Sequence, residues 1–356
     1  MALSLTAAKA LTFVTTYKCG ARCKHCLMEC VASDYERLSL RDMQAVIKWF
    51  ADETKGKVVI FTGGECTYLG DDLLEAIAYA CSRGLSTRIV TNAEWAISEN
   101  LSREMVTALS DAGLEELNIS YDDFHGEWIP FDNIKFAWDS SKYANFSTVV
   151  LASCRSAGSK ITFRTLTRDL GVDLELSDSG NTLVPVTGTL PNRNTKYYFS
   201  KMNLYRLGRA HQLTQDTYIE QEYYDSYSVC PDCATDVVVS PNRTLSMCCG
   251  INHRQDSLLT LQSIDELVSK SIGPDTRLHE IIANLGPQYV LKFVEEEIGL
   301  FLQKPSYFTT PCEICELLSS SKIASSYIKE NIDSLYEAYE LECCLDTAIK
   351  DALKER

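Results

Sequence analysis

The sequence feature that most constrains the fold is an alternation of short β-rich runs with longer helical patterns from residue 11 onward. The short runs are mainly β-branched and apolar, whereas the longer segments repeat apolar residues every three or four positions. Runs and helical segments follow one another as 11–17, 39–52, 58–62, 71–82, 86–91, 98–112 and 116–120, and residues 160–166 predict a further strand. Successive right-handed βα units form a parallel sheet or barrel, whose ligands gather at the carboxyl ends of its strands.

Charge and cysteine content narrow the function. The chain has 34 basic and 49 acidic residues, a formal net charge of −15, so it has no basic footprint for a phosphate backbone, and nucleic-acid partners are not expected. Fifteen cysteines among 356 residues are too few for a disulfide scaffold, and no signal peptide precedes them. We expect a cytoplasmic protein with reduced thiols and no membrane span. Reduced thiols grouped at short spacing indicate bound metal.

Three of these thiols follow the first predicted strand. Cys19, Cys23 and Cys26 lie in Y17-K-C-G-A-R-C-K-H-C26. Thiolates at C-x3-C-x2-C spacing can hold three irons of a [4Fe–4S] cluster and leave the fourth iron open to a small chelating molecule. A structural zinc is the alternative, with Cys30 or His25 as its fourth ligand.

This loop resembles the cysteine motif of the radical SAM superfamily, and further motifs of that superfamily follow in step with the βα units. F61-T-G-G-E-C66 resembles its G-G-E motif, I89-V-T-N-A93 its ribose-contacting segment and L117-N-I-S-Y-D-D-F-H125 its I-S-x-D segment. The resemblance implies a [4Fe–4S] cluster with an open iron at the three cysteines. It also implies S-adenosylmethionine bound by Gly63, Gly64, Glu65, Thr91, Asn92 and Ser120. Asp122, just beyond the fourth strand, is a candidate substrate contact, with helix capping as the alternative.

Six later cysteines form a second group. The stretch C230-P-D-C233 to C248-C249 predicts a hairpin that turns at Pro241-Asn242, and C312-E-I-C315 follows. The arrangement resembles the SPASM or twitch domain of radical SAM enzymes, which implies one auxiliary [4Fe–4S] cluster at Cys230, Cys233, Cys248, Cys312 and Cys315. Zinc is again the alternative. Cys248 and Cys249 are expected to face opposite ways. Cys249 is then a spare thiol, either a candidate hydrogen donor to a substrate radical or a packed side chain.

The segment N203-L-Y-R-L-G-R-A210 resembles the G-R-A segment that precedes such auxiliary domains. Arg206 or Arg209 is expected to pair with a carboxylate of the cofactor or substrate, or else to be an exposed structural arginine.

The predicted fold class is α/β. Residues 1–225 are expected to form a partial (β/α)6 TIM-like barrel and residues 226–321 a smaller auxiliary-cluster domain. Residues 322–356 are expected to form a C-terminal helical extension that docks as an amphipathic helix.

The resemblance implies reductive cleavage of S-adenosylmethionine to a 5′-deoxyadenosyl radical, which abstracts hydrogen from a substrate C–H. The expected substrate is a ribosomally made peptide that undergoes epimerisation, cross-linking or oxidation, with flavodoxin or ferredoxin as electron donor. Only about ten residues precede the first strand, so no leader-binding domain is expected at that end. Two alternatives remain open: a dehydrogenase or epimerase of a sugar or aminocyclitol, and a non-catalytic Fe–S or zinc protein.

Overall fold

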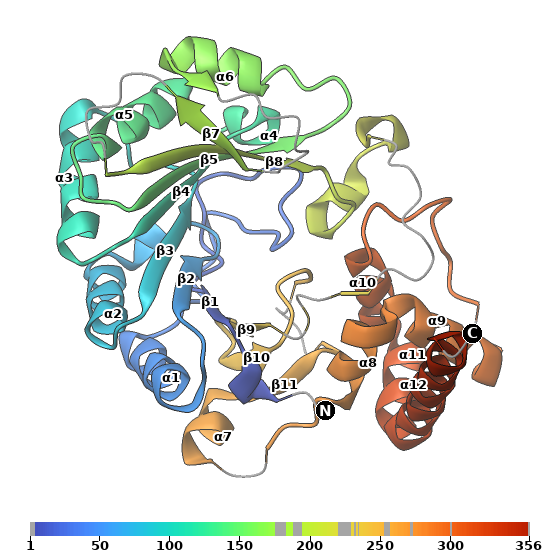
Figure 1. Ribbon diagram of the computed structural model, residues 1–356. Helices are drawn as coiled ribbons and strands as arrows, with labels where there is room; N and C mark the ends of the chain where they lie inside the picture. Colours follow the sequence, from blue (N-terminus) through green and yellow to red (C-terminus); the bar gives the residue numbers. More distant parts are fainter. Residues whose placement is uncertain are drawn as a thin grey trace.

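The computed structural model describes residues 4–174, 183–187, 194–219, 229–230, 233, 235–252, 257–270, 273–299 and 301–354. A curved, largely parallel sheet carries helices on its outer side, and a second group of helices, from the C-terminal part of the chain, lies to one side of it (Figure 1). Among the helices described here, none is long and apolar enough to cross a membrane.

Six parallel strands form the centre of the sheet, in the order β1-β2-β3-β4-β5-β8. Their bounds are Ala10–Val14 (β1), Val58–Thr62 (β2), Ser86–Thr91 (β3), Glu116–Ser120 (β4), Thr148–Arg155 (β5) and Lys196–Asn203 (β8). In-register pairing places Val14 of β1 beside Thr62 of β2, so the carboxyl ends of these strands are level and the loops that follow them meet. The predicted partial (β/α)6 barrel is confirmed.

The helices that connect these strands pack on the outer side of the sheet (Figure 1). They are Leu40–Glu53 (α1), Asp71–Ser82 (α2), Glu99–Asp111 (α3) and Phe131–Ser141 (α5), whereas the short Asp123–Gly126 (α4) follows the carboxyl end of β4. Helix α1 shows why these segments are helical. The Ser39 side chain accepts a hydrogen bond from the backbone N–H of Asp42 at its start, and its buried residues recur at helical spacing, from Met43 to Phe50.

The prediction of a strand at residues 160–166 is wrong. This segment leads into a helix, Phe163–Leu170 (α6), because Thr162 and Thr165 satisfy each other's backbone N–H groups in a capping box. The buried Leu166 and Leu170 are four residues apart, which fits a helix. The sixth parallel strand is instead β8, and the sheet continues beyond it through the antiparallel strands Leu183–Thr187 (β7) and Asp173–Leu174 (β6).

A hairpin from the second half of the chain extends the other edge of the sheet. Asp236–Val239 (β9) pairs in parallel with β1, and Thr244–Ser246 (β10) returns antiparallel to β9, as predicted. Thr260–Ser263 (β11) follows and leads into Ile264–Ser269 (α7), which Ser263 caps. The predicted boundary at residue 225 lies outside the described residues. The strand pairing nevertheless joins the hairpin to the barrel in one sheet.

The C-terminal helices have an apolar core of their own. They are Arg277–Leu285 (α8), Pro287–Ile298 (α9), Cys312–Ser320 (α10), Lys322–Glu330 (α11) and Ile332–Lys354 (α12). Ile281, Val290, Leu318 and Leu335 are buried in this core together with three cysteines of the second group. The C-terminal extension is two helices, α11 and α12, with Asn331 between them.

Trp138 tests how the outer helices hold the sheet. It is fully buried on α5, and its ring centroid lies 5.1 Å from that of Tyr197 and 5.8 Å from that of Phe199. Trp138→Ala should lower the free energy of unfolding by about 3–5 kcal/mol, because a large cavity is left beside β8. Urea denaturation of the reduced protein measures this change. Trp128→Ala, at a side chain that is 47% exposed, is the control, and equal losses in the two variants would contradict the packing described.

Candidate active site

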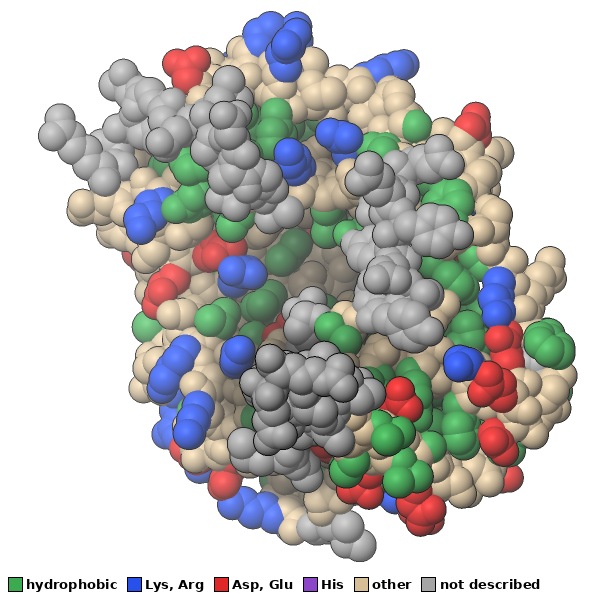
Figure 2. Space-filling view, turned by 45° about the vertical axis from the view of Figure 1, so that its right-hand side comes forward, with side chains coloured by type: hydrophobic (Ala, Val, Ile, Leu, Met, Phe, Trp, Pro, Cys, Tyr) green, Lys and Arg blue, Asp and Glu red, His purple; other side chains and the backbone are tan. Residues whose placement is uncertain are grey.

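The loop that follows β1 carries the first three cysteines to the carboxyl edge of the sheet. Its two ends are held together, because the N–H of Val31 donates to the carbonyl of Tyr17 and the N–H of Leu38 to that of Thr15. Cys19 and Cys23 are buried, and Cys26 is half-buried. All three line a cavity of about 430 Å³ at the open side of the barrel. Figure 2 shows apolar side chains gathered around a hollow in the middle of one face of the molecule.

The three thiols have different electrostatic surroundings. Burial, with the nearby Glu65 carboxylate, raises the pKa of Cys19 to about 12, and burial also raises the pKa of Cys23. A hydrogen bond with the Cys30 side chain lowers the pKa of Cys26 to about 6, against the opposing effect of burial. Because Cys19 and Cys23 are costly to ionise in this buried setting, a cation bound between the three sulfurs would stabilise their thiolates.

Gly63 and Gly64 lie at the end of β2, directly against this loop. A Cβ on Gly63 would lie 2.5 Å from the carbonyl oxygen of Thr16, and one on Gly64 would lie 2.1 Å from that of Lys18. Their position brings the N–H of Gly64 to the Thr16 carbonyl at 2.7 Å. The glycine pair therefore lets the cysteine loop pack directly against the end of β2. Both glycines also line the cavity, as the motif predicts.

Glu65 is fully buried, and its carboxylate joins the ends of β2 and β3. One oxygen accepts from the Thr91 hydroxyl at 2.8 Å and from both the N–H and the hydroxyl of Thr67. The other accepts from the N–H of Asn92 at 2.8 Å. Glu65 is not among the described residues that line the cavity, whereas Thr91 and Asn92 are. The S-adenosylmethionine contact predicted for Glu65 stays a prediction, and the structure shows a supporting role beneath the cavity.

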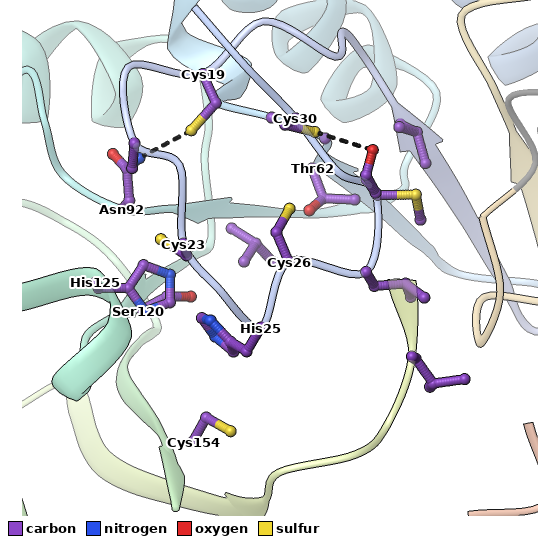
Figure 3. Close-up of a pocket in the computed structure, with 18 of the residues that line it drawn as sticks. Cys19, Cys23, His25, Cys26, Cys30, Thr62, Asn92, Ser120, His125 and Cys154 are labelled. Atoms are coloured by element: carbon purple, nitrogen blue, oxygen red, sulfur yellow. Dashed lines mark hydrogen bonds between the residues drawn. The ribbon is translucent and has the colours of Figure 1, made fainter. Parts of the chain in front are cut away.

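Thr91, Asn92 and Ser120 come together at the strand ends, as expected from the motifs. The side-chain amide of Asn92 donates to the Cys19 sulfur at 3.4 Å (Figure 3). Asn92 therefore links the third strand to the cysteine loop, and Ser120 lies at the end of β4.

Asp122 is 1% exposed and caps α4, accepting from the N–H groups of Phe124 and His125. It also accepts from the N–H of Cys154 at 3.2 Å and lies 3.5 Å from Nε2 of His25. His25 and His125 line the cavity, and Asp122 is not among its described lining residues. The capping alternative is thus observed, and the substrate contact of Asp122 stays a prediction.

Burial lowers the pKa of His25 to about 4, so a neutral imidazole faces the cavity.

Sequence reasoning missed the far wall of the cavity. Residues 202–205 and Leu207, at the end of β8 and just after it, line this wall together with Val238, Cys154 and Cys249. Cys154 is near the end of β5 (Figure 3). The strand-end rule that located Asn92 and Ser120 would also have found Cys154 and Asn203, had β5 and β8 been recognised as strands.

The second group of cysteines gathers among the hairpin, the segment before it and helix α10. Burial raises the pKa of Cys233, Cys248 and Cys315, and charge repulsion from the neighbouring thiolates, including Cys230 and Cys312, raises it further. These electrostatic influences indicate that the five cysteines lie in one neighbourhood, and their role as ligands of one cluster stays a prediction. The N–H of Gly250 donates to the Cys248 sulfur at 3.4 Å.

The side chains of Cys248 and Cys249 face different ways, as predicted, although both residues follow the end of β10. Cys248 is buried with the second group, whereas Cys249 is exposed and lines the first cavity.

The two arginines of the segment N203-L-Y-R-L-G-R-A210 have neither of the roles expected from the sequence, because both contact other parts of this chain. Arg206 and Arg209 are both buried, Arg206 pairs with Glu313, and Arg209 donates to backbone carbonyls.

A sequence profile described as the radical SAM superfamily matches residues 13–166, the part of the chain that holds the cysteine loop and the strand-end motifs. Across these residues the chain is similar to the radical SAM superfamily. The radical SAM match covers β1 to β5 and ends within α6, so the later cysteines lie beyond it.

Several known proteins resemble this chain. A "putative peptide biosynthesis protein YydG" of Bacillus subtilis (strain 168) is 23% identical over 125 residues, 35% of this chain and 39% of that protein. The chain thus aligns with well under half of that relative's length. Streptococcus suis SuiB bound to precursor peptide SuiA is 15% identical, with a TM-score of 0.38 over 90% of this chain and 73% of that one. The anSMEcpe structure "with bound AdoMet and Kp18Cys peptide" is 11% identical, with a TM-score of 0.48 over 94% and 99%.

The buried carboxylate of Glu65 predicts a pH dependence of stability. Burial raises its pKa to about 7 in the folded protein, from about 4.3 in an unfolded chain. Between these values the folded state keeps a proton that the unfolded state has released, so ionising Glu65 weakens the fold as pH rises. The free energy of unfolding, measured on metal-free reduced protein and taken relative to Glu65→Gln, should fall by about 3 kcal/mol from pH 4.5 to 7.5.

Glu104→Gln, on the exposed side of α3, controls for the loss of a carboxylate as such. A difference between wild type and Glu65→Gln that stays constant across this pH range would contradict the raised pKa of the buried Glu65.

Proposed function

We propose that this protein cleaves S-adenosylmethionine at a [4Fe–4S] cluster held by Cys19, Cys23 and Cys26, and that it abstracts hydrogen from a peptide substrate. The observation that supports the first part most directly is the shared cavity. The three thiols line it together with Asn92 and Ser120 from the strand ends and with residues 202–205 and Leu207. When bound, the cluster and S-adenosylmethionine supply the radical chemistry, and the protein binds, orients and excludes water.

The donor set fits an iron–sulfur cluster better than zinc. Structural zinc usually has four protein ligands, whereas three thiols at C-x3-C-x2-C spacing leave one iron of a cubic cluster open.

The burial and grouping of the later cysteines support an auxiliary [4Fe–4S] cluster at Cys230, Cys233, Cys248, Cys312 and Cys315. Five candidate thiols exceed the four that one cube requires. The pair Cys312 and Cys315 lies three residues apart on α10, so both sulfurs are on one side of that helix. Reduction of the first cluster requires an outside electron donor, for which flavodoxin or ferredoxin is our proposal.

A peptide is the proposed substrate because of the cavity's far wall and the names of the relatives. The wall is built from the end of β8 and the residues after it, and Met202 in this wall is 53% exposed. The relatives include a putative peptide biosynthesis protein and proteins described in complex with peptides. The proposed reaction is an epimerisation, cross-link or oxidation of a ribosomally made peptide.

The test of the substrate class is deuterium transfer into 5′-deoxyadenosine. Candidate peptides encoded beside the gene, each deuterated at Cα and Cβ, are incubated with reduced protein and S-adenosylmethionine. A deuterated aminocyclitol and a deuterated sugar serve as the other arms. Deuterium recovered in 5′-deoxyadenosine from a peptide supports the proposal. Transfer from the sugar or aminocyclitol alone would identify a small-molecule enzyme, and no 5′-deoxyadenosine at all would identify a non-catalytic metal protein.

Cys249 is proposed as the donor that returns hydrogen to the substrate radical, since its thiol is exposed into the cavity. The thiol S–H bond breaks homolytically, a substrate C–H bond forms, and the resulting thiyl must be reduced by the electron donor before the next turnover. Cys249→Ala should still form 5′-deoxyadenosine but lose about 100-fold or more in epimerised product. Wild-type product formation in Cys249→Ala, with Cys344→Ala as an exposed-thiol control, would make Cys249 a structural residue.

A further inference from the structure

The segment after β8, residues 205–211, contacts both cysteine sites, and we call it the connector. On one side it holds the loop after β1. The Arg209 guanidinium donates to the carbonyl of Cys23 at 2.6 Å and to that of Cys30 at 2.8 Å. The backbone N–H of Arg209 donates to the carbonyl of Cys26 at 3.1 Å. One buried arginine therefore orients three carbonyls of the loop that carries the first thiols.

Gly208 brings the connector into direct backbone contact with the same loop. Its φ is +53°, and a Cβ at this position would lie 2.3 Å from the carbonyl oxygen of Leu27 and 2.8 Å from that of Cys26. A side chain here would push the two segments apart, so glycine is required by both the conformation and the space. The connector and the loop thus move as one unit.

The other side of the connector is held by helix α10, which carries two cysteines of the second group. The sequence C312-E-I-C-E316 places two glutamates one residue after the two cysteines. Successive helical residues are turned by about 100°, so the cysteines form one row and the glutamates a neighbouring row. Glu316 accepts from the N–H of Gly208 at 3.1 Å and pairs with His211 at 2.6 Å. The other glutamate, Glu313, pairs with Arg206 at 3.3 Å.

The contacts of Arg206 and Arg209 are shielded from water, whereas the pair of His211 and Glu316 lies nearer the surface, with the His211 side chain 48% exposed. Arg206 and Arg209 are 9% and 7% exposed, and Glu313 is 4% exposed. The guanidinium of Arg206 lies over the rings of Tyr218 and Tyr307, at 4.8 and 5.4 Å. Breaking a buried charged pair leaves an uncompensated charge. A displacement of α10 is therefore passed to the connector instead of being absorbed by loose side chains.

We propose that the connector couples the two cysteine sites, with Arg209 and Glu316 as positioning residues that set the geometry of the loop around the first cluster according to the occupancy of the second site. The proposal rests on the proposed auxiliary cluster. A cluster in the second site holds Cys312 and Cys315 in place, and therefore also the two glutamates on α10. The glutamates in turn hold the connector, which orients the carbonyls of the loop after β1. Because such coupling is reciprocal, loading the first site favours loading of the second.

The experiment combines two changes in the full chain, loaded anaerobically with iron and sulfide. Cys312→Ala/Cys315→Ala empties the second site, and His211→Ala removes the ion pair with Glu316 without altering α10. Iron content, the EPR spectrum of the first cluster with S-adenosylmethionine and the dissociation constant of S-adenosylmethionine are measured for each variant and for the combination. His211→Lys restores a cation opposite Glu316, and Glu297→Gln on the exposed side of α9 is the unrelated control.

If the proposal holds, emptying the second site weakens S-adenosylmethionine binding about tenfold and shifts the EPR spectrum of the first cluster. His211→Ala should weaken binding in the same direction with the iron content unchanged, His211→Lys should recover it, and emptying the second site should add little in the His211→Ala background. Equal effects of emptying the site in both backgrounds, or no effect in either, would overturn the coupling. Wild type that holds about four irons instead of about eight would instead refute the proposed auxiliary cluster, and the coupling with it.

Discussion

The close contact between the Gly63-Gly64 turn and the loop after β1 is the constraint on which the active site depends. In-register pairing of β1 with β2 brings the two strand ends level, and the absence of side chains on the glycines lets the loop pack directly on the turn. Glu65, the next residue, then ties β2 to the Thr91-Asn92 end of β3, and Asn92 reaches the Cys19 sulfur. The Gly63-Gly64-Glu65 motif, which the radical SAM resemblance associates with ligand binding, is thus also needed for packing the cysteine loop on the sheet.

Much of the fold and the first site followed from the sequence because their signals are local. The strands through residue 120, the cysteine loop and the Asn92 and Ser120 positions depend on short periodic patterns and on the rule that ligands gather at strand ends. The strand predicted at 160–166 failed because a capping box at Thr162 and Thr165 favours a helix. The far wall of the cavity and the burial of Glu65 arise from contacts between distant segments, which periodicity does not encode.

The second half of the chain is joined to the first in two ways. The hairpin β9-β10 extends the barrel sheet beside β1, and the connector holds the cysteine loop on one side and helix α10 on the other. Both links lead to elements that flank cysteines of the second group, Cys233 and Cys248 at the hairpin and Cys312 and Cys315 on α10. The predicted division into a barrel, an auxiliary region and a helical extension therefore describes parts of one connected structure.

The most direct test of this account is the iron and sulfide content per chain of anaerobically reconstituted protein, for wild type beside the triple variant Cys19→Ala/Cys23→Ala/Cys26→Ala. The account predicts about eight irons in wild type and about four in the variant, because the second group of thiols then keeps one cube. A variant that keeps no iron would contradict it, since the later cysteines would then hold zinc or no metal at all.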